Sequence, residues 1–139
     1  MNRASKMAKS KRKETAFIRY LWPDATVDSA GSVRSWERRY DGGDRDWMRL
    51  ACGAPVLLEH KWRQWPGGSR GMMAIVVGAY EQLEEAVETE AADGFLLAAY
   101  WPLHTSVEDV ICYFCFHGLM VQMPAHQFKQ HFIKGDCNE

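Results

Sequence analysis

Strand-like and helix-like apolar patterns alternate through the middle of this chain, and no other feature limits its fold as strongly. Residues 55–61 form a segment of strand length that begins with four apolar residues, and residues 95–100 are an apolar stretch of similar length. Between them, apolar residues recur at the helical spacing of positions 72, 75, 76, 79, 83, 86 and 87, and Gly94 closes the segment. A strand, a helix and a second strand therefore follow one another, which favours a sheet with a helix packed on it.

The flanking segments extend this pattern in both directions. Apolar residues at helical spacing predict a helix over 11–22, which Pro23 ends. The other expected elements are a strand near 33–39, a hairpin of 46–50 with 55–61, strands 111–116 and 119–123 around a turn at His117-Gly118, and a last helix from Pro124 through 132. The order helix, strands, helix, strand, strand, helix predicts an α/β fold with a mixed sheet flanked by helices.

Size and composition indicate one compact domain. The chain has 139 residues, of which 47% are apolar and 25% charged. We expect a flexible basic tail over 1–10, the domain over 11–133 and a C-terminal tail over 134–139. The sequence has no apolar run long enough for a membrane span, and its basic N-terminus lacks the apolar stretch of a secretory signal, so we expect a cytoplasmic protein. Its 4 cysteines are too few for a disulfide framework and are expected to be reduced.

Charge is divided unevenly along the chain, although the formal net charge is −1. Residues 1–49 hold 12 Lys and Arg against 7 Asp and Glu, a balance of +5, whereas residues 50–139 have a balance of −6. A polyanion would therefore meet the N-terminal part first. The alternative to nucleic-acid binding is that the basic N-terminal segment is only a solvated tail. The side chains expected to contact nucleic acid are Lys9, Lys11, Arg12, Lys13, Arg34, Arg38, Arg39 and Arg45.

One constellation of residues suits metal-assisted hydrolysis of a phosphodiester. Asp46 is followed by a strand that contains Glu59 and Lys61, and side-chain alternation puts these last two on one face with Leu57. Mg²⁺ prefers oxygen ligands and is often held by one or two carboxylates together with substrate phosphate. The ammonium group of Lys61 would orient the attacking water or stabilise developing negative charge. The alternative is an ion pair at a strand end without catalytic function.

Two other observations bear on the site. The carboxylate of Glu14 lies on the apolar stripe of the expected first helix, where it needs a partner, unless it only complements the helix dipole. Cys112 and Cys115 form a Cys-x-x-Cys motif, but residues three apart in a strand face opposite sides, which disfavours a shared zinc ion. Buried free thiols are the better interpretation.

Several segments resemble the PD-(D/E)xK nuclease superfamily, and within it the Holliday junction resolvase-like proteins of phages. The segments are KSKRKETAFIRYL at 9–21, ERRYDGGDRDW at 37–47, PVLLEHKW at 55–62, EQLEEAVETEAADGFLLAAYW at 81–101 and GLMVQMPAHQF at 118–128. The resemblance implies a restriction-endonuclease-like core in which Asp46, Glu59 and Glu14 bind Mg²⁺ or Mn²⁺ and Lys61 is the catalytic lysine. Arg45 stands where the family usually has Gly before the catalytic Asp, so Asp44 is an alternative to Asp46.

The resemblance implies a Mg²⁺-dependent endonuclease that resolves Holliday junctions or other branched DNA. A four-way junction has two equivalent strands to cut, so a homodimer with one active site on each is expected. For a phage-encoded chain the cytoplasm would be that of the host cell. The alternatives are a nuclease of the same fold that acts on flaps, single strands or duplex DNA, and a catalytically inactive DNA-binding phage protein.

Overall fold

A five-stranded mixed sheet forms the centre of the molecule, in the order β1-β2-β3-β4-β5. The computed structural model describes residues 3–23, 46–63, 67–90, 92–100 and 105–135, and within these ranges it does not describe the side chains at 3–8, 10, 11, 46, 47 and 90. The strands are β1 (Asp46–Arg49), β2 (Pro55–Trp62), β3 (Gly94–Tyr100), β4 (Ile111–Phe116) and β5 (Leu119–Pro124). The described helices are α1 (Arg3–Leu21), α2 (Gly68–Glu90), the 3₁₀ turn η1 (Val107–Asp109), α3 (Ala125–Phe128) and the π-helical η2 (Lys129–Ile133).

The strand directions follow from the connections. β2 and β3 are parallel and are joined by α2, whereas the other neighbouring pairs are antiparallel. Two hairpins use glycine at positive φ, Gly53 at 87° between β1 and β2 and Gly118 at 84° between β4 and β5. The mixed sheet is thus a β-α-β unit extended by a hairpin strand on one side and by two antiparallel strands on the other.

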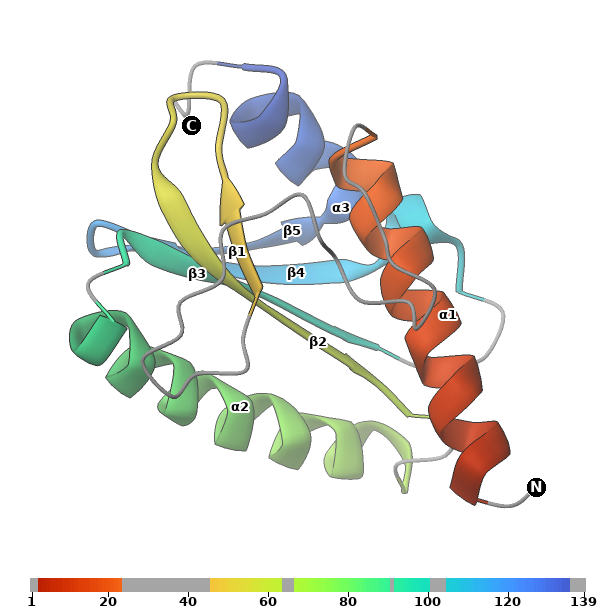
Figure 1. Ribbon diagram of the computed structural model, residues 1–139. Helices are drawn as coiled ribbons and strands as arrows, with labels where there is room; N and C mark the ends of the chain where they lie inside the picture. The colour runs from red at the N-terminus through yellow and green to blue at the C-terminus, as the bar shows by residue number, and fades with distance from the viewer. Residues whose placement is uncertain (1–2, 24–45, 64–66, 91, 101–104, 136–139) are drawn as a thin grey trace.

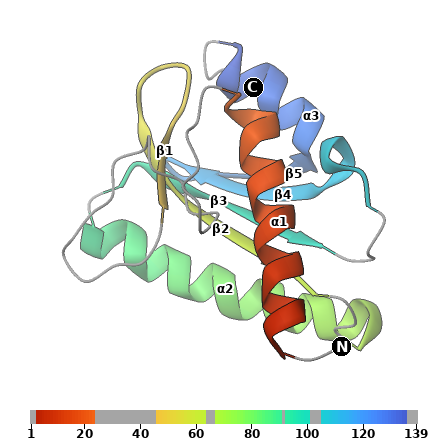
Figure 2. The same ribbon diagram turned by 45° about the vertical axis from the view of Figure 1, so that its right-hand side comes forward.

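Helices cover both faces of the sheet, as Figures 1 and 2 show, with α2 on one side and α1 and α3 on the other. Phe17, Ile18 and Leu21 of α1 are fully buried in a cluster that includes Phe128 and Phe132. Burial of each such side chain stabilises the fold by roughly 2 kcal/mol. A second cluster lies beneath α2, and its fully buried members are Leu57, Leu83, Phe95 and Leu97.

Most of the expected elements are present, and the coarse α/β class with helices on a mixed sheet is confirmed. One difference is that α1 begins at Arg3, so residues 3–10 are helical where a tail was expected. This segment is rich in Ala, Lys, Arg and Met, which favour helix without an apolar stripe to reveal it. The short turn η1 was not expected, and the strand expected near 33–39 lies outside the described residues.

Candidate active site

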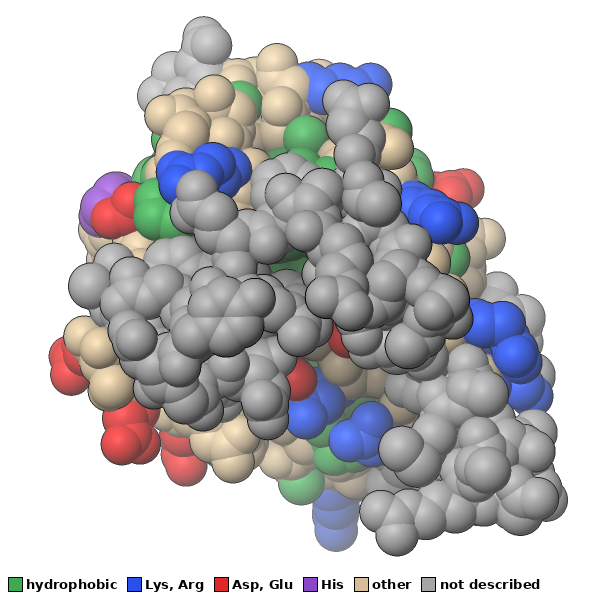
Figure 3. Space-filling view, viewed as in Figure 1, with side chains coloured by type: hydrophobic (Ala, Val, Ile, Leu, Met, Phe, Trp, Pro, Cys, Tyr) green, Lys and Arg blue, Asp and Glu red, His purple; other side chains and the backbone are tan. Residues whose placement is uncertain are grey.

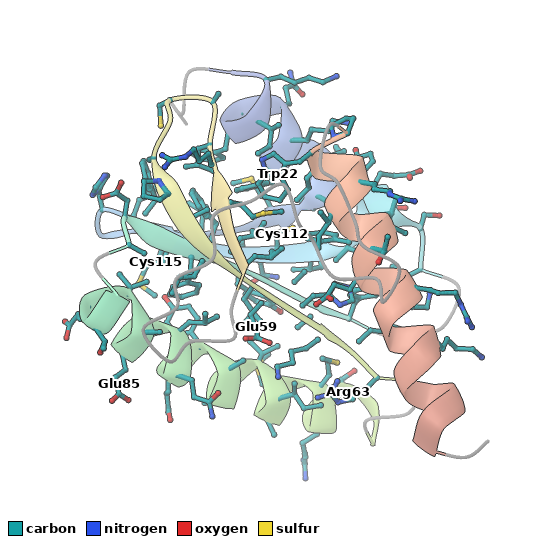
Figure 4. The ribbon with its side chains drawn as sticks, in the orientation of Figure 1. Trp22, Glu59, Arg63, Glu85, Cys112 and Cys115 are labelled. Atoms are coloured by element: carbon teal, nitrogen blue, oxygen red, sulfur yellow. The ribbon has the colours of Figure 1, made fainter. Side chains whose placement is uncertain are left out.

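The carboxyl end of β2 carries the two charged side chains that the sequence placed on one face. Glu59 Oε1 lies 3.4 Å from Lys61 Nζ, and the side chains are 25% and 29% exposed. Figure 4 shows Glu59 directed from β2 toward the α2 side of the sheet. Leu57, which precedes them on this face, is in the cluster beneath α2, so the expected alternation is confirmed. This is a half-buried ion pair, not a fully solvated one.

The pair lies where two parallel strands end together. In the β2–β3 register Glu59 pairs with Leu97 and Lys61 with Ala99, one position before β3 ends at Tyr100. In open α/β sheets, ligands commonly bind just outside the carboxyl ends of parallel strands, because the connections diverge there. The location of Glu59 and Lys61 is therefore typical of a ligand site.

The opposite face of the same strand end holds a buried histidine–tyrosine pair. His60 Nε2 and the Tyr100 hydroxyl are 2.9 Å apart, and the His60 ring also lies 5.6 Å from the Phe17 ring, between centroids. Burial, together with nearby Lys13 and Arg63, lowers the pKa of His60 from 6.5 to about 3. The imidazole is thus neutral at pH 7, and the hydrogen bond ties β2 to β3 beneath α1.

α1 brings its own charged side chains to this second face. Lys13 Nζ lies 5.2 Å from the centre of the Trp62 ring and 6.0 Å from that of Tyr100, which is cation–π geometry. Burial and the charge of Lys9 lower the pKa of Lys13. Burial raises the pKa of Tyr100, and the charge of half-buried Glu14 raises it further. The pattern that put Glu14 toward the core is therefore correct.

The expected site residues are divided between the two faces. Glu14 belongs to the helix that packs over His60 and Tyr100, whereas Glu59 and Lys61 are on the side covered by α2. Asp46 begins β1 opposite Leu58 in the register, not opposite Glu59, and its side chain is outside the description. Of the four expected site residues, Glu59 and Lys61 lie together on the α2 face, whereas Glu14 lies on α1, which packs on the opposite face. The side chain of Asp46 is not described.

Among the side chains described, there is no group of three or more His, Cys, Asp or Glu that could hold a metal ion. Asp44, the alternative to Asp46, lies outside the described residues. Cys112 is in the core cluster beneath α1 while Cys115 packs against the cluster beneath α2, so the two thiols lie on opposite faces of the sheet, as expected.

The end of the sheet that carries Glu59 and Lys61 is also rich in basic side chains. Lys9 and Arg12 lie on α1, with Arg12 exposed, and exposed Arg63 and Arg70 follow β2 and begin α2. Four exposed glutamates occupy the other half of α2, Glu81, Glu84, Glu85 and Glu88. In Figure 3 acidic side chains gather at the lower left over that half of α2, while basic ones line the lower centre and right. The charge difference along the chain is thus also a difference in space.

Sequence reasoning missed two arginines and a histidine–tyrosine pair at this end of the sheet. Arg63 and Arg70 belong to no motif and lie outside the basic N-terminal half, although both flank the loop after the Glu-x-Lys strand. The pairing of His60 with Tyr100 had no local signal, since it depends on the parallel register. Of the expected phosphate contacts, Arg34, Arg38, Arg39 and Arg45, like the side chain of Lys11, lie outside what is described.

Comparisons with known proteins add no assignment. Neither family models nor curated proteins nor solved structures gave a significant match to the chain. In the part of the chain that the structure describes, no helix combines the length and the apolar character that a membrane span requires.

Proposed function

We propose that the chain is a metal-dependent DNA endonuclease that hydrolyses phosphodiester bonds in four-way or other branched DNA. The observation that carries the proposal is the half-buried Glu59–Lys61 pair at the carboxyl end of two parallel strands. Exposed Arg63, which follows β2, and exposed Arg70, in the first turn of α2, support an anionic substrate. Resemblance to PD-(D/E)xK nucleases in the Glu-x-Lys strand gives the pair its proposed chemistry.

The donor chemistry of this end of the sheet suits Mg²⁺ or Mn²⁺. Such ions take carboxylate oxygens and are often held by one or two carboxylates, with substrate phosphate completing the set. Glu59 would be one ligand, and Asp44, which precedes the neighbouring strand β1, is the proposed second, because Asp46 pairs with Leu58 of the cluster beneath α1 and not with Glu59. A bound ion would polarise the substrate phosphate and lower the pKa of a water molecule. Glu14 has no assigned ligand role here, because its helix packs on the other face.

Lys61 is the side chain that would act directly on the reacting phosphate. Its ammonium group is held 3.4 Å from the Glu59 carboxylate, on a strand end fixed by pairing with β3. A cation so fixed stabilises negative charge on the phosphate oxygens as the transition state forms, without reorganisation at that moment. It also orients a water for attack on phosphorus. Arg63 and Arg70 would hold the flanking phosphates.

Cleavage of a synthetic four-way junction with Mg²⁺ tests the proposal. Lys61→Met and Glu59→Gln should each lower the cleavage rate at least ~10²-fold while junction binding without metal stays within a few fold. Lys134→Met and Glu85→Gln are matched controls, because both residues are exposed and lie outside the Glu59–Lys61 pair. Wild-type cleavage by Lys61→Met would refute the mechanism.

A panel of substrates separates the possible targets of the same chemistry. The junction, a flap, a single strand and a linear duplex are cleaved side by side, and preference for the junction supports a resolvase. A homodimer is proposed with it, because two-fold symmetry would bring one site to each of the two equivalent strands. Sedimentation of the free and junction-bound protein measures this. Salt-dependent binding of DNA without cleavage in any metal would instead indicate an inactive DNA-binding protein.

A further inference from the structure

A small groove opens beside the candidate active site, on the same face of the sheet. It has a volume of about 280 Å³ and lies between the first turns of α2 and the ends of β3 and β4. Met72, Met73 and Val76 form its helix side, and Ile111 and Tyr113 form its β4 side. This volume is just below the ~300–1,000 Å³ range of drug-sized ligand sites, so it fits one ring system better than a larger ligand.

The groove exists because β3 carries a small side chain at the right position. Phe95, Leu97 and Ala99 follow one another on the α2 face of β3. The first two fill the space beneath the helix, whereas Ala99 is too short to do so and lines the groove. Its lining is therefore apolar at the bottom, with thioether and phenol groups suited to packing on a flat aromatic ring.

Lys61 lies one strand away from this groove. It pairs in the parallel register with Ala99, which lines the groove, and neighbouring strands are roughly 4.8 Å apart, so the backbone of Lys61 is next to the groove although its side chain is not part of the lining. Glu59, on the same face, lies on the side of Lys61 away from the strand end. A ligand that spans both features has an anionic group at Lys61 and a flat apolar ring over Ala99.

We propose that the groove takes one unstacked base of the DNA whose adjacent phosphate lies at Lys61. This inference rests on the proposed function and adds how the substrate is held. Branched DNA offers bases at the crossover that are more easily unstacked than those of a continuous duplex, and base–aromatic stacking is worth ~1–3 kcal/mol per base.

The rim of the groove favours a base edge over a second phosphate. Asp109, exposed at the end of η1, puts a carboxylate there, and Ser69 adds a hydroxyl at the start of α2. A carboxylate repels phosphate but accepts hydrogen bonds from exocyclic amino groups, such as N4 of cytosine. Orientation follows, because the phosphate lies toward Lys61 and the amino edge of the base toward Asp109. Bases with an exocyclic amino group should therefore bind better than thymine.

Metal-free binding tests the groove independently of catalysis. Fluorescence anisotropy measures the affinity of wild type for a four-way junction and for a short single strand, each with either a cytosine or an abasic residue at the probed position. We expect the abasic residue to weaken wild-type binding about 10-fold. Met73→Asp should weaken binding of the intact DNA by a similar factor. This variant should then bind the abasic DNA with the same affinity as the intact DNA.

Val77→Asp is the matched control for added charge. Met73 and Val77 are both exposed residues of α2, at 55% and 49%, but only Met73 lines the groove. Val77→Asp should keep the 10-fold abasic effect, and Asp109→Asn should remove the preference for cytosine over thymine. Circular dichroism checks that each variant folds, and Met73→Gln repeats the test without a new charge.

The outcomes separate this inference from the proposed function. An equal abasic effect in wild type and Met73→Asp, equal weakening by both aspartate variants, or no DNA binding at all would overturn the groove as a base site. If the abasic substitution weakens binding by wild type but not by Met73→Asp, and the protein cleaves no DNA with any metal, the base site is supported and only the nuclease proposal is rejected.

Discussion

Protonation of His60 should make the stability of this protein fall in mildly acidic solution. In the native state the ring is buried, its Nε2 is bonded to the Tyr100 hydroxyl at 2.9 Å, and its pKa is lowered to about 3. In the unfolded chain histidine titrates near its ordinary value of 6.5. Between these values the unfolded state binds more protons than the native state, so stability falls as the pH falls through this window.

The size of the effect follows from the two pKa values. From pH 8 to pH 5 the unfolded chain gains about 2 kcal/mol from protonation at this one residue, and the native state gains almost nothing. Below pH 5 the slope approaches about 1.4 kcal/mol per pH unit, and it flattens as the pH reaches 3. The charges that face His60, Lys13 from α1 and Arg63 after β2, both oppose its protonation, and the larger cause is burial.

Urea unfolding followed by tryptophan fluorescence measures the effect, with wild type compared with His60→Gln at pH 8, 7, 6 and 5. Glutamine offers the Tyr100 hydroxyl a hydrogen-bonding amide but has no proton to gain, so the difference between the two proteins isolates the titration. We expect the advantage of wild type over the variant to shrink by about 2 kcal/mol from pH 8 to pH 5. His126→Gln, at an exposed histidine, is the control and should follow wild type. Parallel pH profiles for wild type and His60→Gln would refute the reasoning.

Backbone packing and thiol burial give further expectations. Gly94→Ala should destabilise the protein by about 3 kcal/mol in urea unfolding, because the added Cβ would overlap the Cys115 carbonyl of the paired strand, and a neutral effect would contradict this. Gly78→Ala, in the exposed interior of α2 with open space around it, should instead stabilise by about 0.5–1 kcal/mol. In thiol titration Cys52, which is exposed, should react at once. Cys112 should react only on unfolding, because burial raises the pKa of its thiol, and fast reaction of both would show that the core is open.

Local features of the fold were predictable from the sequence. The hairpins around Gly53 and Gly118 depend on residues that reach positive φ easily, and such residues can be read directly from the sequence. Alternation along β2 correctly placed Glu59 and Lys61 together, because the side-chain period of a strand is fixed at two. Periodicity also identified the buried stripe of α1 and the core face of α2.

Long-range features were not predictable. The parallel pairing of β2 with β3 joins residues far apart in the sequence, and only this pairing brings Tyr100 to His60 and Ala99 to Lys61. The same holds for the side of the sheet that each helix covers. A stripe of apolar residues shows that α1 packs on the sheet, but not on which face, so Glu14 could be assigned to the site of Glu59 on sequence grounds alone.

The two faces of β2 are connected through the backbone that they share. His60 lies between Glu59 and Lys61, and its hydrogen bond to Tyr100 fastens β2 to β3 at the level of the ion pair. Proton uptake by His60 would introduce a buried positive charge near Lys13, so it would loosen the strand end that holds Lys61 in place. As the pH falls toward 3, this proton uptake should therefore impair the candidate site from the face opposite to it. Such an effect should disappear in His60→Gln, which has no ring nitrogen to protonate.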